Sequence, residues 1–151
     1  MNNNVTAGKA ALAATAVLAG LSIFQLLLAA GAPFGQAAWG GTHEGTLPTG
    51  LRIGSAVAVV LYAGAAALVL RRAGFRIRWV SAAVARIGTW VVTALLVLGA
   101  LGNVASSSPW ERAVLGPVTF VLAGLFLVVA RTAEEPPPVP RPTSVHRQAA
   151  H

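Results

Sequence analysis

The amino-acid sequence predicts an all-α protein, an antiparallel four-helix transmembrane bundle. Mean hydropathy is +0.70, and only 10% of the 151 residues are charged. All eleven basic and four acidic residues lie outside four charge-free stretches, which are Ala10–Ala30, Ile53–Leu70, Ile87–Val104 and Ala113–Ala130. One ionic side chain in hydrocarbon costs about 2.5–3.5 kcal/mol on insertion scales, so this segregation indicates an integral membrane protein.

Each charge-free stretch is long enough to cross a bilayer. About 18 residues reach roughly 27 Å as an α-helix, and capping residues extend the helix toward the roughly 30 Å of a hydrocarbon layer. A membrane β-barrel would need alternating polarity, whereas Val114–Ala130 is apolar on every face. We expect one membrane domain, residues 1–131, with spans at about residues 7–31, 50–72, 82–104 and 109–131.

The first span is expected to end at Gly31 and Pro33, because Gly tolerates a left-handed terminus and Pro cannot continue a helix. The small residues at positions 30–32 also resemble a signal-peptidase site. The charge-free stretch of the first span is longer than the apolar core of a signal peptide, usually about 7–15 residues, so we predict an uncleaved span. Cleavage, the alternative, would leave the topology of the remaining spans unchanged.

The other spans carry their own start and stop signals. Thr49 is expected to cap the second span and Gly74 to end it, and Ser81 is expected to cap the third. The run Ser108-Pro109-Trp110-Glu111 predicts a capping box that opens the fourth span. Gly116-Pro117 predicts a bend in that span, because Pro removes a helix hydrogen bond.

Residues 132–151 differ in composition from the rest of the chain. They are rich in Pro and polar residues, so we expect a disordered cytoplasmic tail with polyproline II character. The run Pro137–Arg141 resembles a Pro-rich ligand, and the preferred interpretation is a solvated spacer.

The distribution of Lys and Arg orients the spans. Only Arg52 and Arg112 lie on one side, against nine basic residues on the other. Cytoplasmic loops are enriched in basic residues, so we expect both termini in the cytoplasm and residues 32–50 and 105–110 outside. Many Arg but one Lys, with abundant Ala and Val, favour a high-GC bacterial source and hence the plasma membrane. The nine residues are Lys9, Arg71, Arg72, Arg76, Arg78, Arg86, Arg131, Arg141 and Arg147.

The net charge of +7 bears on partners. Basic residues between spans set topology and contact lipid, so we expect anionic headgroups near the cytoplasmic Arg cluster as the partner and no nucleic acid. The sequence is also compatible with a homo-oligomer or with a membrane protein as the partner.

Polar residues gather near the outer ends of the spans. They predict a shallow outward-facing pocket, and the alternative is that they simply meet water and headgroups. Arg52 is expected to be the cation of this layer, paired with Glu44 or Glu111, unless it reaches toward phosphate headgroups. The pocket residues are Gln25, Trp39, His43, Glu44, Arg52, Ser55, Asn103 and Glu111.

The sequence offers few residues that could carry out catalysis. The chain has no Cys, which excludes thiol nucleophiles and Cys-ligated metals, and no ionisable side chain inside the charge-free stretches. His43 and Glu44 could supply two metal ligands, but a catalytic site needs at least three. His146 and His151 are expected on the opposite face. We therefore predict no catalytic, metal-binding or cofactor-binding residues, no cofactor and no enzyme.

The loop of residues 31–41 contains several Gly, Pro33, Phe34 and Trp39, which predicts a folded cap whose aromatic rings pack on the bundle. Together with Leu47-Pro48, Leu51-Arg52 and Ser55, this pattern resembles that of small four-span bacterial membrane proteins. The resemblance covers the first two spans and implies no particular activity.

Two functions follow as expectations. The first is a non-enzymatic accessory or structural component of the plasma membrane. The alternative is a small-molecule binder or transporter that uses the outer polar pocket. A deep cavity lined by Gln25, Tyr62 and Asn103 would favour the alternative, and tightly packed spans would favour the first.

Overall fold

The computed structural model describes residues 2–133, and over these residues the chain is helical with short connections. Four helical segments are each long and apolar enough to cross a membrane, the fourth being Glu111–Thr132, and this confirms the predicted fold class. Of the tail expected at residues 132–151, Thr132 is the last residue of α4 and Ala133 is buried, and residues 134–151 lie outside the described residues. The helices are α1 (Asn2–Ala30), α2 (Thr49–Arg72), α3 (Ala82–Ala105) and α4 (Gly116–Thr132), with 3₁₀ turns η1 (Gly35–Ala37) and η2 (Trp39–Gly41) and a π turn η3 (Glu111–Leu115).

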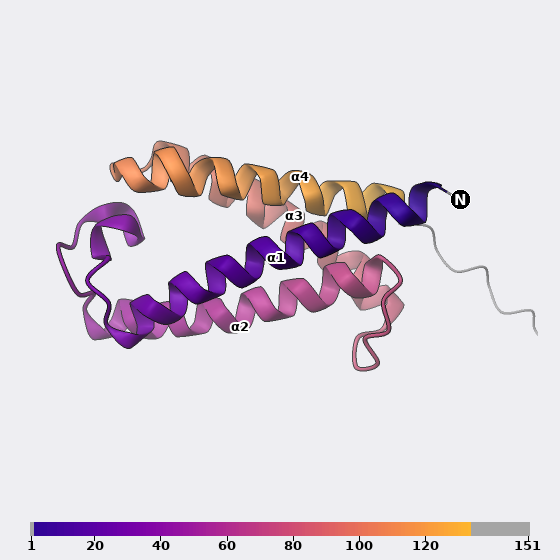
Figure 1. The fold of residues 1–151 in the computed structure, drawn as a ribbon, viewed down its shortest axis with the longest axis horizontal. Coiled ribbons are helices and arrows are strands. Elements are labelled where there is room, and N and C mark those ends of the chain that lie inside the picture. Colours follow the sequence, from indigo (N-terminus) through magenta and orange to yellow (C-terminus); the bar gives the residue numbers. More distant parts are fainter. Residues whose placement is uncertain (1, 134–151) are drawn as a thin grey trace, which may run out of the picture.

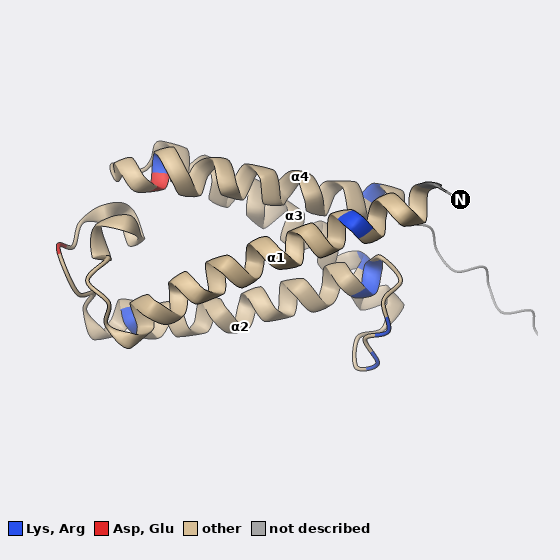
Figure 2. Cartoon of the chain, viewed as in Figure 1, with Lys and Arg blue, Asp and Glu red and all other residues tan. Residues whose placement is uncertain are grey.

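The helices pack as an antiparallel bundle in which each contacts the next, and α1 also packs against α4 (Figure 1). We call the end with residues 31–48 and 106–110 the capped end. The opposite end, where α1 begins and residues 73–81 join α2 to α3, is the basic end. Figure 2 shows that most of the Lys and Arg positions in the described chain lie at this end. The described basic residues at this end are Lys9, Arg71, Arg72, Arg76, Arg78, Arg86 and Arg131.

Most of the expected helix ends form as the residue types suggest. Gly31 and Gly74 end α1 and α2 with φ of +96° each, a conformation that favours Gly. Ser81 caps α3, since its Oγ accepts from the Val84 N–H at 3.2 Å. The Thr49 cap was a wrong prediction, because Pro48 occupies the cap position. The Pro48 carbonyl accepts from the N–H of Leu51 and of Arg52 and closes the first turn without a side chain.

The fourth span begins with half of the predicted capping box. Ser108 Oγ accepts from the Glu111 N–H at 3.3 Å, as expected for a cap. The Glu111 side chain does not return to the Ser108 N–H, which instead donates to Ser106 Oγ at 3.1 Å. Just before Pro117, the Gly116 N–H donates to the Glu111 carbonyl five residues back and forms the π turn η3.

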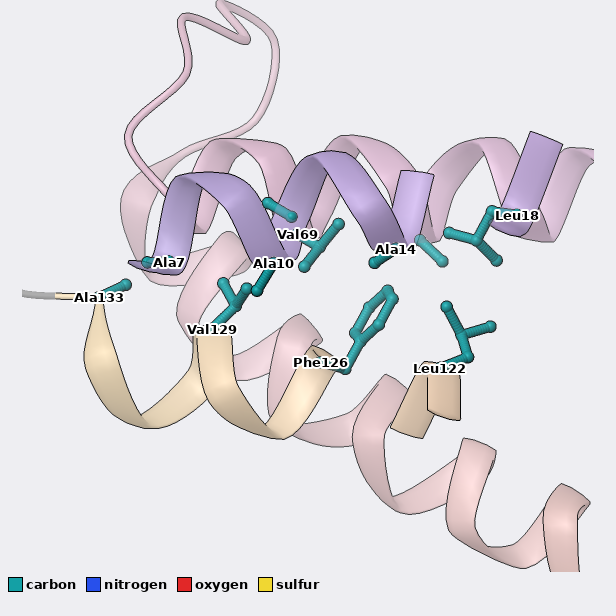
Figure 3. Close-up of a cluster of buried hydrophobic side chains, with 11 residues drawn as sticks. Ala7, Ala10, Ala14, Leu18, Val69, Leu122, Phe126, Val129 and Ala133 are labelled. Carbon is teal, nitrogen blue, oxygen red and sulfur yellow. The ribbon is translucent and has the colours of Figure 1, made fainter. Parts of the chain in front are cut away.

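The largest apolar core lies in the half of the bundle nearest the basic end. Phe126 is fully buried and projects from α4 toward α1 near Ala14 and Leu18 (Figure 3). A stripe of small residues at helical spacing allows α4 to approach α1 closely. Elsewhere many large apolar side chains are exposed, as expected where they face lipid. The stripe consists of Ala7, Ala10, Ala11 and Ala14.

Candidate functional site

Residues 31–48 form a folded cap over one end of the bundle. Leu28, Ala38 and Leu47 make a small buried cluster between the cap and α1. The Gly35 N–H donates to the Gly45 carbonyl at 2.8 Å. A Cβ at position 35 would lie 2.7 Å from the His43 carbonyl oxygen, so this crossing requires Gly. The connection is therefore packed against the bundle, as the sequence predicts for a cap.

The cap is hydrogen-bonded to the α3–α4 connection. Ser108 Oγ donates to the Gln36 carbonyl at 2.7 Å, and Ser107 Oγ donates to the Gly40 carbonyl at 3.0 Å. Gly41 has φ of +68°, and a Cβ there would lie 2.6 Å from Ser108 Cβ. These contacts join the α1–α2 connection to the α3–α4 connection at the capped end.

Trp39 places its indole on α2. Its Nε1–H donates to Ser55 Oγ at 3.1 Å, and Ser55 is fully buried. Gly54 makes room for the ring, since a Cβ there would lie 2.9 Å from Trp39 Cη2. The backbone of Trp39 has φ of +56°, which residues other than Gly rarely adopt. The surrounding contacts therefore hold the residue in this conformation. Trp39 is still 42% exposed and Phe34 is 47% exposed, so the two aromatic rings pack on the bundle less completely than we expected.

Beneath the cap lies a cavity of about 310 Å³ to which all four transmembrane segments contribute. This volume is near the lower end of ligand sites, which span roughly 300–1,000 Å³. Tyr62 places the inner part of the cavity near the middle of α2. The lining residues are Leu21, Phe24, Gln25, Ala38, Trp39, Ala58, Tyr62, Asn103, Glu111, Leu115 and Thr119.

Glu111 supplies a buried carboxylate to this cavity. The residue is only 7% exposed. One oxygen, Oε1, accepts from the Gly40 N–H at 2.9 Å, and Oε2 accepts from the Ser106 hydroxyl. Both donors lie in the connections at the capped end, so Glu111 fastens the cap while its side chain lines the cavity.

Asn103 of α3 and Thr119 of α4 form a hydrogen-bonded chain in the cavity wall. The Thr119 hydroxyl donates to the Leu115 carbonyl at 2.7 Å, so its oxygen accepts from Asn103 Nδ2 at 3.1 Å. This arrangement fixes the orientation of the Asn103 amide and leaves its Oδ1 as an acceptor. Gln25 adds a second acceptor, because its Oε1 is buried and has no hydrogen-bond partner among the described residues.

The structure brings together four of the eight sequence-predicted pocket residues. Gln25, Trp39, Asn103 and Glu111 line the cavity. Ser55 lies behind Trp39 and accepts its indole N–H.

The other three predicted residues lie outside the lining. Arg52 has a different partner from the carboxylates that we expected: its Nε donates to the Ala29 carbonyl at 3.0 Å, in the last turn of α1. Unpaired carbonyls at a helix C-terminus attract such a cation. His43 is hydrogen-bonded through Nδ1 to the Thr42 hydroxyl, and Glu44 is exposed on the cap.

Several residues of the site were not predicted from the sequence. Thr119 and Ser106 are polar residues without a motif, and Leu21, Phe24 and Leu115 are apolar residues that any span contains. One usable signal was the antiparallel topology, which brings the start of α4 beside the end of α3, so Asn103 and Thr119 could have been paired.

Fold and cavity together define a multi-pass membrane protein whose four transmembrane segments line a polar cavity beneath a folded cap. No family model, curated protein or solved structure matches the chain.

Proposed function

We propose that the protein binds a small molecule bearing hydrogen-bond donors in the cavity beneath the cap. The observation that carries this proposal is the buried Gln25 Oε1, which has no partner among the described residues and belongs to a lining residue of a cavity of about 310 Å³. A buried acceptor without a partner costs about 1–3 kcal/mol, so a donor on a ligand would recover that free energy once the Gln25 amide turns toward the cavity.

The rest of the lining supports the same chemistry. Asn103 Oδ1 is a second acceptor, and the Tyr62 hydroxyl can donate or accept. Trp39, Phe24 and Leu115 supply apolar surface, and a few polar groups within an apolar wall are typical of small-molecule sites. This combination favours a binder or transporter over the accessory component that is our other candidate.

We further propose that the basic end faces the cytoplasm of a bacterial cell and that the capped end faces outward. The bias of Lys and Arg toward the basic end supports this orientation. A cysteine replacing Gln36 should then react with an impermeant maleimide in intact cells, and one replacing Phe75 should not. The reverse labelling pattern would refute the orientation and leave the cavity unaffected.

Binding can be tested with two short probes, benzylammonium and the neutral donor benzamide. The protein is placed in lipid nanodiscs as the variant Trp79→Phe/Trp90→Phe/Trp110→Phe, so that Trp39 alone reports. We expect a saturable change in Trp39 fluorescence with at least one probe.

Ala58→Leu, which fills the cavity, should abolish the response. Ala63→Leu on the exposed side of the same helix should leave it unchanged and serves as the matched control. If neither probe gives a saturable response with the single-Trp protein, the binding function is wrong and the accessory function is favoured.

A further inference from the structure

A second hollow lies beside the polar cavity, between α1 and the start of the fourth span. It measures about 360 Å³ and is lined by apolar side chains and Gly20. Trp110 is 59% exposed and Val114 is 44% exposed, so this groove lies at the lipid-facing surface of the bundle. Its lining residues are Val17, Gly20, Leu21, Phe24, Ala37, Trp110, Val114, Leu115 and Val118.

The groove and the polar cavity share a wall. Leu21, Phe24 and Leu115 line both volumes. Phe24 is half-buried, and its α1 neighbours contribute to each side, with Gly20 in the groove and Gln25 in the cavity. Only these three side chains thus separate the polar cavity from an apolar volume that faces lipid.

The charge of the polar cavity has a definite sign. No Lys, Arg or His is among its lining residues, whereas Glu111 contributes a carboxylate. Of the two arginines at this end, Arg52 donates to the Ala29 carbonyl at the end of α1, and Arg112, which follows Glu111 in the chain, is exposed and lies outside the lining. The other groups we identified are the acceptors Gln25 Oε1 and Asn103 Oδ1, and an ammonium group, with donors and no acceptor, complements this set.

We propose that the ligand is a cationic amphiphile, with its ammonium head in the cavity beneath the cap and its hydrocarbon chain in the groove between α1 and the fourth span. The inference rests on the proposed function and specifies its ligand class. Such a molecule would enter sideways from the bilayer past Phe24, with its chain exchanging one apolar environment for another. Because lipid tails are as apolar as the groove, the head supplies the selectivity.

Dodecylammonium carrying bromine at the middle of its chain can locate head and tail separately. Three single-Trp proteins in nanodiscs retain Trp39 in the cavity, Trp110 in the groove or Trp90 on α3, which is exposed and lines neither volume. We expect saturable quenching of Trp110 with the same midpoint as the change at Trp39. Quenching of Trp90 should rise linearly, as simple partition into the bilayer requires.

A variant that fills only the groove separates this inference from the proposed function. Gly20→Leu should be tolerated, because a Cβ there meets nothing within 4 Å. It should weaken binding of dodecylammonium by roughly tenfold and that of benzylammonium by less than about twofold. Dodecanoate, with the opposite charge, should not compete.

The outcomes are distinct. Three results would each overturn the proposal of a cationic amphiphile and leave the binding of the short probes intact. They are linear quenching of Trp110, an unchanged dodecylammonium midpoint in Gly20→Leu, and competition by dodecanoate. Failure of both short probes in the Trp39 assay would instead overturn the proposed function.

Discussion

The two halves of the bundle are built in different ways. Toward the basic end, Phe126, Leu122 and Val129 of α4 pack against a stripe of small residues on α1, and buried volume is filled by side chains. Toward the capped end, α1 and the start of the fourth span leave an apolar groove between them, and all four transmembrane segments line a polar cavity. There, Ser107 and Ser108 donate hydrogen bonds to cap carbonyls, and Glu111 accepts one from the Gly40 N–H, so the cap is held to the bundle.

This difference separates stability from binding within one short chain. Close packing in the basic half supplies dispersion contacts, which drive helix association where lipid removes the hydrophobic driving force. The capped half leaves volume unfilled and a buried acceptor unpaired, which lowers stability and is useful only if something binds there. Added side-chain volume should therefore destabilise the basic half and leave the stability of the capped half nearly unchanged.

The largest effect is expected in the basic half. Phe126→Ala removes a fully buried ring and should lower the free energy of unfolding by about 3–5 kcal/mol. Phe120→Ala on the same helix is the control, since Phe120 is 46% exposed and lines neither cavity. Unfolding of both variants by sodium dodecyl sulfate in mixed micelles measures the difference. Equal losses would show that the basic half is not a specific core.

A smaller loss should follow when the cap is forced away from the α3–α4 connection. Gly41→Ala places a Cβ 2.6 Å from Ser108 Cβ, an overpacking that should destabilise by about 1–3 kcal/mol beyond the backbone strain. Gly45→Ala has a similar φ of +74° and no atom within 4 Å of the new Cβ, so it reports the strain alone. The two variants should therefore differ in midpoint in the same micelle titration, and identical midpoints would refute the packed junction.

The sequence predicts the fold better than the site because the two depend on different signals. Segregated charge marks the spans, and residues such as Ser81 and Gly31 mark helix ends through local chemistry. The lining of the cavity depends on the direction in which individual side chains point. Glu111 has the spacing of a capping residue, and its spacing cannot reveal that its carboxylate turns to Gly40 and Ser106 instead of the Ser108 N–H.

Arg52 illustrates the same limit. Its position between Leu51 and Ile53 at the membrane edge is evident from the sequence. Its partner depends on where α1 ends in space, and the structure supplies the Ala29 carbonyl from a helix that ends about twenty residues earlier. Contacts between elements far apart in the chain therefore decide the site.

One pair of substitutions tests the contrast between the halves most directly. Ala58 and Ala65 lie two turns apart on one face of α2, and Ala58 lines the cavity while Ala65 belongs to the basic-half core. By unfolding in mixed micelles, Ala65→Leu should lose about 1–3 kcal/mol, and Ala58→Leu should change by less than about 0.5 kcal/mol. Equal losses at both positions would contradict the account, because they would mean that no space for a ligand exists beneath the cap.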